Sequence, residues 1–228
     1  MDFKLNDEQE LLRGGLTRFL ATRYDLEKSR SAAKTGQAGS PTSGAPSPTS
    51  SAFSVRPSPP RTGGGIGGGP VEMMLIAEAL GHALVVEPYV DTAVVAAGGL
   101  LRRAGGDIAA DLVEKIVSGT EIVTLAATEP TSGEHWQHVS TAAARDGDHW
   151  VLTGTKIVSA GTPLAGHVLI TARTSGDVCD PAGISLFLVD ISSGATGIEL
   201  HSYRTIDDRR ASDIVLDGLR LPATALFR

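Results

Sequence analysis

The sequence predicts an α+β fold in which an N-terminal helical domain is followed by an antiparallel β-barrel or β-sandwich domain. Up to Gly119, apolar residues recur mainly at helical spacing. Beyond it they fall in short alternating runs that are separated by turn signals. A chain of 228 residues is long enough for one large or two small domains. We therefore expect a helical domain over 1–120 and a β-domain over 121–228.

The N-terminal half contains four segments that are typical of helices. They span residues 6–26, 71–82, 89–103 and 108–118. Asn6 caps the first, with Gln9 at the reciprocal capping-box position. Gly119 is expected to end the last. We interpret Met73 and Met74 as residues that fill gaps in a buried core.

Residues 31–70 interrupt the helical pattern. Of these 40 residues, 33 are Ser, Ala, Thr, Gly or Pro, so the segment lacks the apolar side chains that would offset its ordering entropy. We expect it to be disordered or loosely draped as an insert in the helical domain. Residues 63–70 contain the pattern G-x-G-x-x-G, but no strand precedes it and Pro70 follows it, so a flexible hinge is favoured over a dinucleotide site.

Alternating runs over the second half predict strands. They span 121–127, 138–144, 149–153, 156–160, 167–173, 184–190, 198–203 and 212–217. Turn signals such as Asp146-Gly147-Asp148 separate them. Strands at this spacing favour a barrel or sandwich.

Composition excludes several function classes. The net charge is −6, which argues against nucleic-acid binding. No apolar run is long enough to span a membrane, and the acidic N-terminus lacks the features of a signal peptide. The single cysteine, Cys179, fits the reducing cytoplasm and is interpreted as an unpaired loop thiol.

Familiar catalytic and metal-binding patterns are missing. His135 and His138 are three residues apart but lack neighbouring cysteines at metal-site spacing. The nucleophile motif G-x-S-x-G does not occur. Asp207 and Asp208 lie among arginines, as on a solvated face.

The most informative stretch runs from the strand at Val123 to Thr128-Glu129-Pro130. Pro130 cannot donate to a sheet ladder, so the strand ends there. Thr128 can offer its hydroxyl and N–H to the edge of a flat ring. Glu129 is either a residue that fixes the turn, which we favour, or a catalytic base. A strand end without further function is the alternative.

Several stretches, taken in order, resemble the acyl-CoA dehydrogenase family. They are 2–12, 67–81, 123–133, 145–156 with 172–174, and 212–222. The resemblance covers nearly the whole chain except about 31–62. It implies FAD as cofactor, an acyl-CoA thioester as substrate, and an electron-transfer flavoprotein as acceptor. The reaction implied is α,β-dehydrogenation, as in an oxidoreductase of fatty acid metabolism.

Carried over by position, the family's flavin contacts fall on two segments. They are Leu125, Ala127, Thr128, Gly133 and Glu134 in the first, and Val158, Ser159 and Ala160 in the second. The family usually has serine at the position of Glu134, and Trp-Ile-Thr or Trp-Ile-Ser over 158–160. Ser159 could replace the missing hydroxyl only if the strand slips by one residue. These departures resemble the pimeloyl-CoA dehydrogenase small-subunit type, whose members pair with a large subunit.

The family's C-terminal helical bundle, which usually carries the catalytic glutamate, would follow residue 228. We therefore assign no catalytic residue and expect an incomplete flavin site. Three hypotheses stay open. The first is an acyl-CoA dehydrogenase or a subunit of one, active as an oligomer, and the second is a non-catalytic partner or remnant that completes another chain's flavin site. The third is an unrelated α+β binding module, which requires the resemblance to be accidental. A compensated frameshift over about 31–62 is a separate hypothesis, which translation of the neighbouring reading frame tests.

Overall fold

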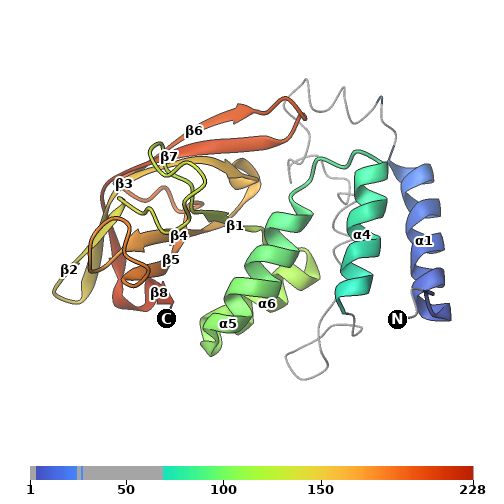
Figure 1. Cartoon of the computed structure of the whole chain (residues 1–228), viewed down its shortest axis with the longest axis horizontal. Coiled ribbons are helices and arrows are strands. Elements are labelled where there is room, and N and C mark those ends of the chain that lie inside the picture. The colour runs from blue at the N-terminus through green and yellow to red at the C-terminus, as the bar shows by residue number, and fades with distance from the viewer. Residues whose placement is uncertain (1–3, 25–26, 28–68, 228) are drawn as a thin grey trace. The chain divides into compact units, whose positions relative to one another are not determined.

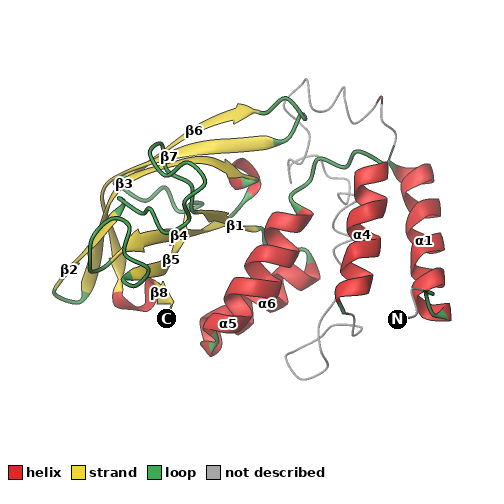
Figure 2. Cartoon of the chain, in the orientation of Figure 1, coloured by secondary structure: helices red, strands yellow, loops and turns green. Residues whose placement is uncertain are grey.

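The computed structural model describes residues 4–24, 27 and 69–227 (Figure 1). The predicted insert at 31–70, including the hinge and the frameshift hypothesis, lies almost entirely outside these residues. The chain divides into two compact units, Met1–Glu121 and Ile122–Arg228. Figure 2 shows that the described helices of the first unit are followed by the strands of the second.

The first unit is built from helices. They are α1 (Asp7–Arg23), α4 (Pro70–His82), the π-helical stretch η2 (Val90–Leu101), α5 (Arg102–Ala104) and α6 (Gly106–Ser118). The predicted capping box is confirmed, because Asn6 and Gln9 exchange backbone and side-chain hydrogen bonds of 2.8 and 3.0 Å. Gly119 ends α6 in the left-handed conformation, as predicted.

Helices α1 and α4 share one apolar core. Its buried residues are Leu16, Leu20, Ile76, Leu80 and Tyr89. The prediction for Met74 was wrong, because its side chain is 56% exposed. An amphipathic helix buries one stripe, and on α4 that stripe is Leu75, Ile76 and Leu80.

The second unit contains one eight-stranded sheet. Its strands are β1 (Val123–Ala126), β2 (Ala142–Asp146), β3 (His149–Ala160), β4 (His167–Arg173), β5 (Ile184–Asp190), β6 (Ile198–Arg204), β7 (Arg210–Pro222) and β8 (Leu226–Phe227). The strand order is β6-β7-β3-β2-β4-β5-β8, and β1 also pairs with β4. A buried cluster that includes Leu152, Ile170, Phe187 and Ile214 forms its core.

The prediction of a purely antiparallel sheet closed into a barrel was wrong, although most of the strand pairings are antiparallel. The sheet is mixed and is not closed into a barrel, since β1 and the start of β2 both pair in parallel with β4. The two strands expected over 149–153 and 156–160 are one long strand, β3. Its register against β7 shifts twice, once beside Gly154 and once between Lys156 and Ser159. Bulges thus bend a continuous strand where the sequence pattern indicated a break.

Gly154 allows the first bulge. Its φ is +151°, and a Cβ added there would lie 2.6 Å from the Thr141 Cα. Only glycine permits this close approach of β3 to the loop that precedes β2. The approach brings that loop against the middle of the sheet.

Candidate functional site

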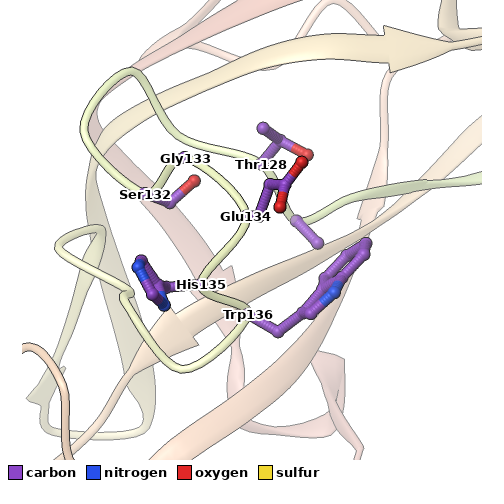
Figure 3. A pocket seen from close by; sticks show the side chains of 7 residues that line it. Thr128, Ser132, Gly133, Glu134, His135 and Trp136 are labelled. Carbon is purple, nitrogen blue, oxygen red and sulfur yellow. The ribbon is translucent and has the colours of Figure 1, made fainter.

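The loop between β1 and β2, residues 127–141, surrounds a pocket of about 440 Å³ (Figure 3). The pocket is lined by Ala127, Thr128, Ser132, Gly133, Glu134, His135 and Trp136. Figure 3 shows the rings of His135 and Trp136 on opposite sides of this loop. A short stretch of chain therefore supplies the whole lining.

Thr128 fixes the inner end of the pocket. Its carbonyl accepts a hydrogen bond of 2.9 Å from the Ile157 N–H, which ties the end of β1 to β3. Gly133 has a φ of +53°, and open space lies where a Cβ would be. The backbone at Gly133 can therefore approach a ligand closely.

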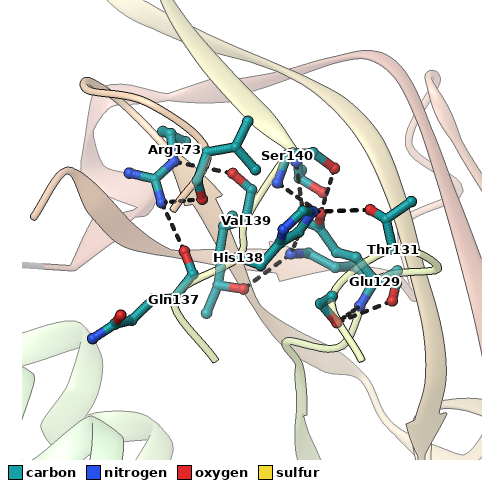
Figure 4. Close-up of polar contacts among 12 residues, drawn as sticks. Glu129, Thr131, Gln137, His138, Val139, Ser140 and Arg173 are labelled. Carbon is teal, nitrogen blue, oxygen red and sulfur yellow. Dashed lines mark hydrogen bonds and ion pairs between the residues drawn. The ribbon is translucent and has the colours of Figure 1, made fainter. Parts of the chain in front are cut away.

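Glu129, which follows Thr128 in the chain, is buried, with 1% of its surface exposed, and its polar contacts are drawn in Figure 4. Its carboxylate accepts hydrogen bonds from the Lys156 ammonium at 2.6 Å, the Ser140 N–H at 2.7 Å and the Thr141 N–H at 3.0 Å. The Ser140 hydroxyl donates to it as well. Lys156, also fully buried, donates to the Thr171 hydroxyl on β4 at 3.0 Å. The Glu129 carboxylate and the Lys156 ammonium together thus join the loop to two strands, β3 and β4.

This network keeps Glu129 ionised. Desolvation would raise its pKa, but hydrogen bonds from Lys156, Ser140 and Thr141 outweigh burial and lower the pKa to about 2. Burial lowers the pKa of Lys156, an effect that Glu129 opposes. A permanently ionised, fully bonded carboxylate is unsuited to accept a proton. Glu129 therefore fixes the turn, which is the role that the sequence favoured.

The second bulge of β3 decides where Val158 and Ser159 lie. Val158 has a φ of +52°, is 53% exposed, and donates its N–H to the Asp213 carboxylate at 2.9 Å. Ser159 is buried and donates to the Leu125 carbonyl at 3.2 Å, while accepting from the Thr162 hydroxyl at 2.6 Å. The strand does shift register here. The Ser159 hydroxyl nevertheless bonds to Leu125 and Thr162 within the domain and is not directed to a ligand by these contacts.

The pocket gathers only part of the predicted site. Of the predicted residues, it brings together Ala127, Thr128, Gly133 and Glu134. Four others do not line it: Leu125, Val158, Ser159 and Ala160. Leu125 lies on β1 and Ala160 pairs with Ala211 at the end of β3.

Sequence reasoning missed several contributors to the site. They are Ser132, His135 and Trp136 in the lining, and Lys156 and Arg173 behind it. Lys156 ends the stretch 145–156 that resembles the family, but its partner Glu129 is 27 residues away, and only the folded sheet brings the two together. Trp136 is an exposed aromatic in an irregular loop, which has no periodicity to reveal it.

Arg173 holds the outer end of the loop (Figure 4). Its buried guanidinium donates to the carbonyls of Gln137 and Val139, each at 3.0 Å, and of Val178 at 2.8 Å. A planar donor fork suits several carbonyls at once. His138 contacts Thr131 at 3.0 Å and lies 3.6 Å from the Cys179 thiol, which is exposed. The loop is therefore fastened at both ends.

The described residues contain neither a cluster of metal-ligating side chains nor a helix able to span a membrane. Within residues 4–24, 27 and 69–227, no group of three His, Cys, Asp or Glu side chains is placed to hold a metal ion. None of the helices in the same residues is long and apolar enough to cross a membrane.

Comparison with known proteins places the pocket in a recognised domain. Residues 124–219 match the family model of the acyl-CoA dehydrogenase middle domain. Acyl-CoA dehydrogenase FadE12 of Mycobacterium tuberculosis (strain ATCC 25618 / H37Rv) is 29% identical over 173 residues, which are 73% of this chain and 43% of that protein. The middle-domain segment contains the pocket loop and most of β1 and of the sheet.

Solved structures show the same fold. A chain of the ChsE4-ChsE5 complex from Mycobacterium tuberculosis matches with a TM-score of 0.80 and 20% identity, over 100% of this chain and 57% of that one. A glutaryl-CoA dehydrogenase from Mycobacterium smegmatis in complex with FADH2 matches with a TM-score of 0.74 and 23% identity, over 97% and 55%. The fold is therefore acyl-CoA dehydrogenase-like, and the chain spans little more than half of these structures.

The pocket residues fit one part of a flavin better than the other. The Thr128 hydroxyl and the loop backbone are uncharged hydrogen-bonding groups, and Trp136 offers a flat apolar face, so both suit a planar ring. Glu134 is a carboxylate at the same pocket, and a phosphate near it would be repelled. The lining fits the isoalloxazine ring and disfavours phosphate.

Proposed function

We propose that this chain is part of a FAD-dependent oxidoreductase of the acyl-CoA dehydrogenase type, in which the pocket at Thr128 and Gly133 forms one wall of the flavin site. The observation that carries the proposal is the match of 124–219 to the middle domain, together with a pocket formed by the loop within that match. The relative solved with FADH2 supports a flavin as the cofactor.

The chain's own residues would position the cofactor. Thr128, whose carbonyl is held by β3, would present its hydroxyl and N–H to the ring edge. The buried ion pair between Glu129 and Lys156 would hold the loop in a fixed position against the sheet. A bound flavin would accept the hydride that such enzymes remove from an acyl-CoA thioester. The acyl chain length is left open, and a role in fatty acid metabolism within the cytoplasm is part of the proposal.

We propose that the rest of the cleft, including the catalytic base, comes from a helical part outside these 228 residues or from a partner subunit. One structural relative belongs to a complex of two proteins, ChsE4 and ChsE5, which supports a pairing of this kind. A large subunit, as in the pimeloyl-CoA dehydrogenase type, a second copy of this chain, and an electron-transfer flavoprotein as acceptor are the partners proposed.

A second candidate is a non-catalytic subunit whose sheet only completes another chain's flavin site. The position of Ser159 favours it. The hydroxyl of Ser159 is bonded to Leu125 and Thr162 inside the sheet, while Val158 and Ala160 have none. The second bulge of β3 therefore brings no free side-chain hydroxyl to a ring edge.

Flavin binding and activity separate these candidates. The full chain is expressed, purified with and without added FAD, and examined for the visible absorbance of bound flavin. The variant Thr128→Val is compared with Thr131→Val, a change in the same loop at a residue that does not line the pocket. Loss of flavin only with Thr128→Val supports the first candidate. Activity that needs an added dehydrogenase and is indifferent to Thr128→Val supports the second.

A further inference from the structure

The pocket lining contains one acidic side chain. Of its seven lining residues, Glu134 is the only carboxylate, and none is Lys or Arg. Glu134 is exposed, so its carboxylate can orient toward any ligand in the pocket. A phosphate brought into this space would meet a like charge, whereas an uncharged ring would not.

The pocket also has an aromatic side chain, Trp136, that is not packed into the hydrophobic core. Trp136 is 77% exposed, although aromatic residues make up only 4% of the chain. The other tryptophan, Trp150, is partly buried and packs edge-on against Phe187 with ring centroids 5.5 Å apart. An exposed indole at the rim of a pocket is a surface on which a planar heterocycle can stack.

Both groups are presented by a loop that is fixed before any ligand arrives. Glu129 anchors one end to Lys156, and Arg173 holds the carbonyls of Gln137 and Val139 at the other. The conformational entropy of the loop is therefore already lost on folding. Ligand binding then requires little further ordering, which favours affinity. What the loop selects depends on the side chains at its centre.

We infer that this pocket binds an uncharged planar heterocycle, the isoalloxazine of a flavin, against Trp136 and Thr128, and that Glu134 discriminates against phosphate-bearing ligands. The identity of the ring rests on the proposed function. The inference adds a selectivity: riboflavin binds at least as tightly as FMN or FAD, although FAD is the cofactor proposed for the assembled site. Within such an assembly, cations of the remaining cleft would have to offset Glu134.

The test is a titration of the full 228-residue chain with riboflavin, FMN and FAD at low salt, followed by flavin fluorescence. A buffer of about pH 8 keeps imidazole side chains generally neutral. Glu134→Gln is expected to raise the affinity for FMN and FAD on the order of three- to tenfold and to leave riboflavin unchanged. Added salt should narrow the gap between riboflavin and FMN in the unmodified chain, because it screens the repulsion. Glu199→Gln, an exposed change outside the lining, is the charge-matched control.

The aromatic wall is tested in the same titration. Trp136→Ala is expected to lower the affinity for all three flavins by about tenfold or more, because each stacks through the same ring. Trp136→Phe should retain part of the binding. Trp150→Phe is the matched control and should leave flavin binding unchanged. A folded Trp136→Ala variant that binds all three as tightly as the unmodified chain overturns the stacking role.

The outcomes distinguish the two proposals. If the folded chain binds none of the three flavins, the inference fails, whereas the proposed function, in which a partner or a further part completes the cleft, is decided by the activity measured with an added dehydrogenase. If flavins bind, but FMN and FAD bind more tightly than riboflavin and Glu134→Gln changes nothing, the inference fails while the proposed function stands. Riboflavin preference that disappears in Glu134→Gln supports the inference.

Discussion

The inner end and the outer rim of the 127–141 loop each contain a glutamate, but one is buried in an ion pair and the other is exposed at the pocket. At the inner end, Glu129 is buried, bonded to Lys156 and surrounded by backbone donors. At the rim, Glu134 and Trp136 are exposed to solvent around the pocket. A buried charge must be fully paired to be tolerated, whereas an exposed one has little effect on folding. The inner end therefore determines the structure, and the rim is free to determine what binds.

The first way to test this comparison is to break the buried pair. Glu129→Gln or Lys156→Met should each destabilise the sheet unit by about 3–5 kcal/mol, because each leaves the other charge buried without its partner. Urea unfolding followed by tryptophan fluorescence reports on this unit, since both tryptophans lie in it.

The exposed pair between Asp146 and Arg220 provides the control. Asp146→Asn should cost at most about 1 kcal/mol, as surface ion pairs generally do. The double variant Glu129→Gln/Lys156→Met should cost less than the sum of its two single changes, because neither charge is then left alone. Equal losses for Glu129→Gln and Asp146→Asn would remove the distinction between a buried and an exposed ion pair.

The free energy of unfolding should depend on pH because Glu129 is ionised in the folded chain. The pKa of Glu129 is lowered from 4.5 to about 2 in the folded chain, so its contribution is fully present above about pH 4.5. It is lost as the pH falls through about 2. The contribution is about 3 kcal/mol from the difference between the two values. The stability gap between the unmodified chain and Glu129→Gln should therefore narrow as urea unfolding is repeated from about pH 5 downward. A gap that stays constant over this range would contradict the assignment.

Arg173 stabilises the other end of the loop by donating to the carbonyls of Gln137 and Val139. Arg173→Lys should cost about 2–3 kcal/mol, because a single ammonium cannot replace a guanidinium fork that reaches several carbonyls. The N–H of Val139, which donates to the Val178 carbonyl at 3.0 Å, should lose protection from hydrogen exchange. Arg145→Lys, an exposed change that also alters a bond to a carbonyl, should leave this protection intact. Loss of protection in both variants would point to general loosening.

Much of the fold follows from local patterns in the sequence. The capping box at Asn6 and the stop at Gly119 locate helix ends correctly, because caps depend on residues that are close in sequence. The strand expected over 138–144 begins only at Ala142, because the N–H groups of Ser140 and Thr141 are bonded to Glu129 and not to a neighbouring strand. The competing partner is eleven or more residues away, which no local pattern contains.

The candidate site was predictable only where it depends on sequence order. The motif around Thr128 identified the pocket loop, and the turn-fixing role of Glu129 was favoured from the residues alone. The orientation of Ser159 was not predictable, because a bulge at Val158 sets it, and a register shift of one residue reverses which side chains face inward. Whether the transferred residues contact a flavin stays a prediction.

Changes at the exposed rim should have the smallest effect on the free energy of unfolding. Glu134→Gln and Trp136→Ala should change the free energy of unfolding by no more than about 0.5 kcal/mol, because both side chains are exposed and outside the core. Urea unfolding in the absence of flavin measures this directly, with tyrosine fluorescence or circular dichroism for the tryptophan variant. A loss comparable to that of Glu129→Gln would mean that the rim helps to hold the loop, and its residues could then not vary independently of the fold. Near-neutral values, combined with altered flavin selectivity, would show that ligand choice can change at this site without cost to the sheet that supports it.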